Sequence, residues 1–347
     1  MSKKNSSVKF NKSFKSNPRI LNIYKIFKKN ISKFKEKLFV VAVSGGADSL
    51  ALSSLTKFNQ YEGNNRFIYV LVDHGFRKSS YQEALKVKKL IRQKIDENLF
   101  ILQNKKKFTN NLQKKFRDMR YKELFNFCNK KNVKVLITAH HFNDQIETFF
   151  IRLSRGSGIQ GLSSIQMINK TDKKVKLFRP LLEVKKKELE YISKKIFKKY
   201  FNDPSNCNKK FLRTQIRELT SKFDKHGVSL DQVFKSINNI NTSKNLINKH
   251  IKDLMKFIAK KEKGKILIRH KDFFILDTEV KRIVLGNLIK DINEHNYPPR
   301  SKKIYLVIKK FESRESSKLT LGGCLLKMDK TLITIQKEHK KGAFYKK

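Results

Sequence analysis

The run SGGADS, residues 44–49, has the composition of a phosphate-binding loop. It follows the apolar segment Leu38–Val43 and precedes a helix-like pattern that starts near Asp48. Glycines allow backbone N–H groups to turn inward around an anion, and the positive end of the following helix would face that anion. The two serine hydroxyls add hydrogen-bond donors. The alternative is a tight strand-to-helix turn in which Asp48 only caps the helix.

Two other phosphate-binding motifs do not fit the sequence. The Gly-x4-Gly-Lys-Ser/Thr loop of the common nucleotide hydrolases is absent. A Gly-x-Gly-x-x-Gly occurs at Gly156, Gly158 and Gly161, but it follows a helical stretch, whereas a dinucleotide site needs a strand before its glycines. The SGGADS run therefore remains the principal candidate for a phosphate site.

Short apolar runs predict the elements that must position this loop. Between the runs lie helical patterns, in which apolar residues recur at i, i+3 and i+7. Uninterrupted apolar strands that alternate with helices predict an α/β fold, with a Rossmann-like parallel sheet covered by helices on both faces. The predicted strands are Leu38–Val43, Phe67–Val72, Leu99–Leu102 and Val133–Thr138.

Polar clusters follow two more of these strands. Asp73 and His74 come directly after the second, and His140 and His141 after the fourth. Ligands bind at the carboxyl ends of parallel strands, so we expect these residues near the SGGADS loop. The two histidines lack a third ligand at zinc spacing, which favours packing or phosphate contact over a metal site.

An acidic pair and several arginines complete the candidate site. Asp144 and Glu147 are three residues apart on a predicted helix, so they share a face that suits an ammonium group or Mg²⁺; the alternative is a solvated acidic face. The arginines are candidates for phosphate or nucleotide contacts, and an exposed helix face is the alternative for the first two. These arginines are Arg117, Arg120, Arg155, Arg213 and Arg217.

Composition indicates a polyanionic partner. Lys and Arg total 80 against 30 Asp and Glu, a net charge of +50, which favours nucleic acid over a membrane surface. No apolar run approaches the length of a membrane span, so no membrane association is expected. The three cysteines lie far apart, which disfavours zinc ribbons, iron–sulfur clusters and a disulfide framework.

Changes in sequence texture predict three parts. Residues 1–36 read as a mobile basic arm, helical from about Ile20 to Phe34, with an organellar transit peptide as the alternative. Residues 37–221 read as the catalytic domain. Residues 222–347 read as a helix with Ile247, Ile251 and Ile258 on one face, followed by a small α+β domain that includes a hairpin around Gly322-Gly323.

The SGGADS loop after a buried strand resembles the pyrophosphatase-type loop, or PP-loop, of enzymes that cleave ATP between the α and β phosphates. Four further stretches resemble the tRNA(Ile)-lysidine synthetase family closely from Val41 to Arg217, and more weakly beyond. One small departure is Phe76, where leucine is usual. The stretches are VDHGFR, QKKFRDMRY, AHHFNDQIETFFIRLSRGSGIQGL and DPSNCNKKFLRTQIR.

The resemblance implies a ligase that uses ATP to join L-lysine to the wobble cytidine of a tRNA(Ile) with a CAU anticodon. It further implies a cytoplasmic enzyme, Mg²⁺ held through Asp48, and a homodimer as a candidate assembly. The second C-terminal domain of longer members is expected to be missing, which leaves the grip on the acceptor arm open.

The resemblance also assigns roles to the candidate residues. It implies catalytic roles for Asp48, Asp144, Glu147 and Arg117, and contacts to lysine or tRNA for Asp144, Glu147, Arg213 and Arg217. Contacts to ATP are implied for Ser44, Gly45, Gly46, Ala47, Asp48, Ser49, Asp73, His74, Arg120, His140 and Arg155.

Three other functions compete with this interpretation. A tRNA thiolase of the same fold would need a sulfur-carrying cysteine pair or a cluster. A glutamine-dependent amidating synthetase would need a glutaminase part, and the sequence has no N-terminal catalytic cysteine. A non-catalytic RNA-binding module on the same fold would not need the intact SGGADS loop.

Overall fold

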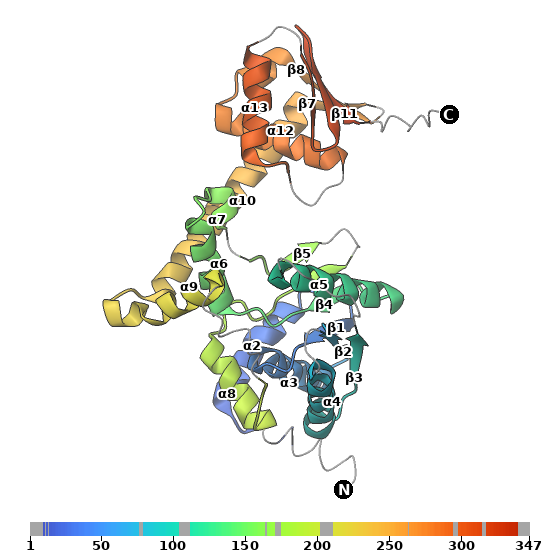
Figure 1. Cartoon of the computed structure of the whole chain (residues 1–347), viewed down its shortest axis with the longest axis vertical. Helices are drawn as coiled ribbons and strands as arrows, with labels where there is room; N and C mark the ends of the chain where they lie inside the picture. The colour runs from blue at the N-terminus through green and yellow to red at the C-terminus, as the bar shows by residue number, and fades with distance from the viewer. Residues whose placement is uncertain are drawn as a thin grey trace. The chain divides into compact units, whose positions relative to one another are not determined.

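A computed structural model of the chain divides into two compact units, residues 1–240 and 241–347. We describe each unit by itself (Figure 1). The structure describes residues 10, 12, 14–75, 79–103, 112–163, 165–170, 175–201, 211–262, 264–293, 298–313 and 317–338.

The first unit is built on a six-stranded sheet in the order β3-β2-β1-β4-β6-β5. All neighbouring strands are parallel except β5 and β6, which are antiparallel. The parallel sheet and its first four strands are therefore confirmed, and β5 and β6 extend one edge. The strands are β1 (Leu38–Val43), β2 (Arg66–Asp73), β3 (Leu99–Gln103), β4 (Val135–Ile137), β5 (Ile168–Lys170) and β6 (Lys176–Phe178).

Helices cover both faces of this sheet (Figure 1). In β1, Phe39 and Val41 pack into one core with α2, α3, α4 and α8, whereas Val40 packs into a second core with α5. This alternation follows from the two-residue period of a strand. The bounds are α2 (Pro18–Ile31), α3 (Ala47–Glu62), α4 (Ser80–Ile95), α5 (Leu112–Lys130), α6 (Phe142–Leu153), α7 (Ile159–Leu162), α8 (Lys186–Phe197), α9 (Leu212–Ser221), η2 (Phe223–His226) and α10 (Leu230–Ile258).

The prediction of a mobile arm over residues 1–36 is wrong for its described part. The expected helix is present as α2, but Ile20, Phe27 and Ile31 on its apolar face are buried in the core beside α3. Arg19 forms a two-pronged salt bridge with Glu188 of α8, at 2.7 and 3.0 Å. The lysine-rich composition hid this amphipathic face, because the lysines of α2 occupy the opposite, exposed side.

The second unit is built on a five-stranded antiparallel sheet in the order β7-β8-β11-β10-β9. Apolar residues of the neighbouring helices pack against apolar residues of this sheet and form one core. The predicted hairpin is present, and Gly322 and Gly323 turn between its first two strands with φ of 60° and 75°. The elements are β7 (Ala259–Glu262), β8 (Lys265–Arg269), α11 (His270–Phe274), α12 (Thr278–Ile292), α13 (Ser301–Glu312), β9 (Ser317–Leu321), β10 (Cys324–Met328) and β11 (Leu332–Lys337).

The two units divide at residue 240, inside α10, and not at residue 221 where the sequence texture changes. A small apolar cluster explains the difference. Ile237 of α10 is buried against Phe142 and Ile146 of α6, with Val233 and Phe234 packed beside them. The first turns of α10 therefore belong to the unit that carries the SGGADS loop. No helix in the described residues is long and apolar enough to cross a membrane.

The burial of α2 yields a stability prediction. Replacing Phe27, which is fully buried, by alanine should lower the free energy of unfolding by about 3–5 kcal/mol, because the transfer free energy is lost and a cavity remains. Urea denaturation of the full chain measures this change. Lys25→Ala, on the exposed side of α2, is the control and should change it by less than about 0.5 kcal/mol. Equal stability of both variants and the wild type would support a loose arm instead.

Candidate active site

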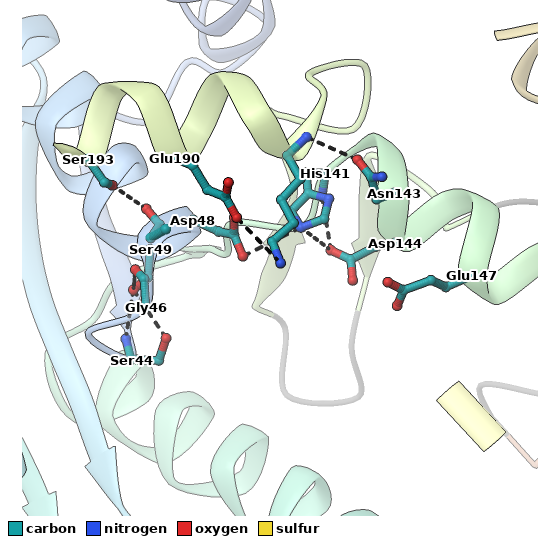
Figure 2. Close-up of polar contacts among 12 residues, drawn as sticks. Ser44, Gly46, Asp48, Ser49, His141, Asn143, Asp144, Glu147, Glu190 and Ser193 are labelled. Carbon is teal, nitrogen blue, oxygen red and sulfur yellow. Dashed lines mark hydrogen bonds and ion pairs between the residues drawn. The ribbon is translucent and has the colours of Figure 1, made fainter. Parts of the chain in front are cut away.

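The SGGADS loop joins β1 to α3 and is closed by its own serines. The Ser49 hydroxyl accepts a hydrogen bond from the Ser44 N–H at 3.1 Å and donates to the Gly46 carbonyl at 3.0 Å (Figure 2). Gly46 caps α3 with extended backbone, so the free N–H groups of the first helical turn face the loop. This arrangement provides a positive helix end and an array of donors, which suits a phosphate group.

Gly45 is fixed by conformation and by space. Its φ of +82° lies in the left-handed region, and a Cβ atom there would come within 2.5 Å of Val87 on α4. The loop is also held from behind. Ser193 of α8 donates to the Ala47 carbonyl at 2.5 Å, and the Phe201 N–H donates to the Gly45 carbonyl at 3.0 Å. These contacts fix the path of the loop before any ligand arrives.

The polar cluster after β2 lies at the same end of the sheet as the loop, because β1 and β2 are parallel and in register. Asp73 is buried and accepts a hydrogen bond from the Gly75 N–H at 3.0 Å, which closes a tight turn. His74 packs against Phe116 of α5, with ring centroids 5.4 Å apart. On α5, Arg117 and Arg120 are exposed, and Arg117 also lies over the ring of Tyr121.

His140 follows β4, and its protonation is controlled by its surroundings. Its Nδ1 lies 2.9 Å from the Thr138 hydroxyl. Burial, opposed by Asp144 and helped by the positive charges of Arg179, Arg117 and Arg213, lowers the pKa of His140 to about 3. His140 is therefore neutral at physiological pH. Because the charges of Arg117 and Arg213 affect this pKa, both arginines lie close enough to His140 to interact with it electrostatically.

His141 links the phosphate loop to the acidic pair. It caps the N-terminus of α6, and its Nε2 lies 3.5 Å from Oδ2 of Asp48 and 3.6 Å from Oδ2 of Asp144 (Figure 2). Burial opposes the charged form, but the carboxylates of Asp144 and Asp48 outweigh it and raise the pKa of His141. From the sequence, packing or phosphate contact is expected for His141, and the resemblance implies no further role. The sequence did hold a signal for helix capping. His141 follows a predicted strand and precedes Asp144 by three residues, which is the spacing of a capping box.

The acidic pair of α6 is bound to two arginines of α9, which packs beside α6. Arg213 donates to Glu147 at 2.6 Å and to Asp144 at 2.7 Å, and Arg217 donates to Glu147 at 2.7 and 3.2 Å. Only 3% of the Glu147 side chain is exposed. Burial favours the neutral form of Asp144, but His141, His140 and Arg213 lower its pKa to about 2. Both carboxylates are thus largely buried and paired with positively charged side chains.

The structure therefore connects several of the predicted residues through one line of polar contacts. The line runs from Asp48 of the loop through His141 to Asp144 (Figure 2). Arg213 then joins Asp144 to Glu147. Arg155 does not lie at this centre: it is exposed beyond the C-terminal end of α6, and the 12 residues of that helix span about 18 Å. The prediction of an ATP contact for Arg155 has no support in this geometry.

Comparisons with known proteins agree with the site. A family model for a PP-loop domain matches residues 19–222, a range that begins inside α2. The tRNA(Ile)-lysidine synthase of Wolbachia pipientis wMel is 32% identical over 305 residues, which cover 86% of this chain and 70% of that protein. The tRNA(Ile)-lysidine synthase of Orientia tsutsugamushi (strain Boryong) is 30% identical over 314 residues, with 86% and 69% covered.

A solved structure supports the fold alone. The U34-tRNA thiolase NcsA from Methanococcus maripaludis superposes with a TM-score of 0.52 at 16% sequence identity, covering 65% of this chain and 78% of that one. The lysidine synthases match a larger share of this chain at about twice that identity. With its PP-loop, its acidic pair on α6 and this extent of similarity, the chain belongs to the tRNA(Ile)-lysidine synthase family.

Proposed function

We propose that this protein ligates L-lysine to the wobble cytidine of the CAU anticodon of tRNA(Ile) and consumes ATP. The base carbonyl of the cytidine attacks the α-phosphate, and pyrophosphate leaves. The ε-amine of lysine then attacks the adenylated base carbon and expels AMP. The product, lysidine, pairs with A and shifts codon reading from AUG to AUA. The continuous contact line from the PP-loop to the acidic pair, in a chain of this family, carries the proposal.

In the first step the loop holds the leaving pyrophosphate. Negative charge builds up on this group, and N–H donors that are already oriented stabilise it without reorganisation. The donors come from Gly45, Gly46 and the first turn of α3, and the hydroxyls of Ser44 and Ser49 lie beside them. Arg117, whose charge helps to lower the pKa of His140, is the candidate for the α-phosphate or the nucleotide. Asp73, His74 and Arg120 remain candidates for the nucleotide on the same side of the sheet.

Asp48 has the properties of a Mg²⁺ ligand. Its Oδ1 is buried, and no residue in the described ranges hydrogen-bonds to it. No group of three metal-binding side chains occurs among the described residues, and Asp48 would contribute one carboxylate. That fits Mg²⁺, which takes its remaining ligands from phosphate and water. When bound, Mg²⁺ would neutralise charge on the phosphates. The second Asp48 oxygen faces His141, which orients the carboxylate.

In the second step Asp144 and Glu147 recognise lysine. Lysine is attracted as a cation, although its ε-amine must attack uncharged, so a fixed pair of carboxylates can hold its α-ammonium group while the other end reacts. Arg213 and Arg217 are candidates for contacts with the lysine carboxylate, the α-phosphate or the tRNA backbone. Because Glu147 is buried, its ion pairs with Arg213 and Arg217 are stronger than they would be in water.

The partners follow from charge and family. The net charge of +50 favours tRNA, and contacts between lysines and phosphates release counterions, so binding should weaken steeply with salt. We assign tRNA contacts to the C-terminal unit as well as to the catalytic unit. A homodimer and a cytoplasmic location remain predictions from the family resemblance.

The cysteines argue against the thiolase alternative. Burial raises the pKa of Cys128 to about 12 and that of Cys324 to about 11, so neither side chain is a ready sulfur carrier. Cys207 lies outside the described residues.

The PP-loop role predicts the effect of filling the space at Gly46. A Cβ atom there would have only ordinary contacts, the nearest at 3.6 Å, so Gly46→Val should fold normally but block the approach of pyrophosphate. Pyrophosphate release should fall by roughly 100-fold or more, the cost of losing such donors. A coupled pyrophosphate assay with CAU-anticodon tRNA measures it. Gly63→Ala, at the other end of α3, is the control and should keep full activity. A normal rate in the Gly46 variant would refute the phosphate cradle.

The acidic pair predicts a block between the two steps. With ATP labelled at the α-phosphate, Asp144→Asn and Glu147→Gln should form adenylated tRNA but slow lysine transfer by roughly 30-fold or more, as loss of a buried charge contact does. Label should then accumulate on the tRNA even with lysine present. Glu190→Gln, whose carboxylate pairs with Lys186 on α8, is the control. If neither variant labels the tRNA, the pair serves metal or ATP binding instead.

A further inference from the structure

The acidic pair that should receive lysine already accepts hydrogen bonds from the protein at every oxygen. Oδ1 of Asp144 accepts from Arg213, and its Oδ2 accepts from the His141 N–H at 3.1 Å. Oε1 of Glu147 accepts from Arg217, and its Oε2 accepts from both arginines. An ammonium group that binds this pair therefore competes with the arginines for the same two carboxylates.

We infer that ATP and lysine bind cooperatively, because the phosphates of ATP attract Arg213 and Arg217 away from the acidic pair and so open it to lysine. This inference rests on the proposed function and specifies how the two substrates communicate. Arg213 and Arg217 act in it as internal counter-ions that occupy the lysine site until the nucleotide is present.

Charge balance favours the replacement of an arginine by lysine over the binding of lysine beside both arginines. The two carboxylates are matched by two guanidinium groups in a buried setting. Adding an ammonium group while both arginines stay would place unmatched positive charge in a region of low dielectric constant, which is costly. Releasing an arginine without a new partner would give up its charge-assisted hydrogen bonds to the buried Glu147 carboxylate. An incoming anion lowers this cost, and a polyphosphate at the PP-loop is one.

The arginines have a route to the phosphates. The PP-loop carries Asp48 in the first turn of α3, and Asp48 lies within electrostatic reach of Arg217, whose pKa it helps to raise. Arg213 lies close enough to His140, at the end of β4, to disfavour its charged form. The guanidinium fork binds phosphate in the same bidentate manner as carboxylate, so a modest swing exchanges one partner for another. The side chains of Arg213 and Arg217 are 34% and 39% exposed, which leaves them room to move.

Linkage makes this inference measurable. If ATP tightens lysine binding by some factor, lysine must tighten ATP binding by the same factor. Couplings of this kind are typically about 5–150-fold. The coupling should depend on the arginines, because the acidic pair would be open without nucleotide once an arginine is removed.

Isothermal titration calorimetry of L-lysine into the full chain tests the inference, with and without an ATP analogue that resists cleavage between the α and β phosphates. For the wild type the analogue should tighten lysine binding by roughly 5-fold or more. For Arg213→Gln, lysine should bind without the analogue about as tightly as it binds the wild type with it, so the ratio should fall close to one. Arg213→Lys, which keeps the charge but loses the fork, should give an intermediate ratio.

Arg92→Gln is the matched control, because Arg92 on α4 forms a surface pair with Asp96 and should leave the wild-type ratio unchanged. Equal lysine affinity with and without the analogue in the wild type would overturn the inference, and this result needs no variant. Lysine binding that is weaker in Arg213→Gln would overturn it too, since the arginine would then be a lysine ligand. Failure of the proposed function is separate: mass spectrometry of nucleosides from treated tRNA would then find no lysidine in the wild-type reaction.

Discussion

A buried negative charge governs the organisation of this site. The Glu147 carboxylate is almost excluded from water, and such a group is tolerated only when paired and hydrogen-bonded. Its partners, Arg213 and Arg217, lie on α9. Their hydrogen bonds to Glu147 on α6 therefore also hold the two helices together. Asp144 extends the same pairing to His141, and His141 extends it to Asp48 of the phosphate loop. The electrostatics of one carboxylate are thereby connected to the loop that binds the nucleotide.

The sheet supplies the geometry that this charge network requires. Parallel strands end at one edge, which brings the residues after β1, β2 and β4 together from positions far apart in the chain. Hydrophobic packing on both faces keeps that edge rigid. The loop is held from behind by α8, and α6 begins at the edge with a capped N-terminus. Rigid elements therefore carry every residue of the contact line.

The sequence predicted what depends on local pattern. The four apolar strands, the SGGADS turn and the shared face of Asp144 and Glu147 all follow from spacings of a few residues, which periodicity reveals. It could not predict that Arg213 would pair with Glu147, because 66 residues separate them and only the tertiary fold brings them together. The arm over residues 1–36 failed for a different reason. Lysine content dominated the interpretation, while the spacing of Ile20, Phe27 and Ile31 already favoured a buried face.

The position of α2 has a consequence for synthesis of the protein on the ribosome. Arg19 is paired with Glu188, 169 residues later in the chain, and Asn17 donates to Tyr191 of the same helix. At 5–20 residues per second, α2 waits on the order of 10–30 s before α8 has been made. During that interval its apolar face has no complete partner. This helix thus leaves the ribosome long before the helix that completes its burial, and until then its apolar face is open to chaperones that recognise nascent chains.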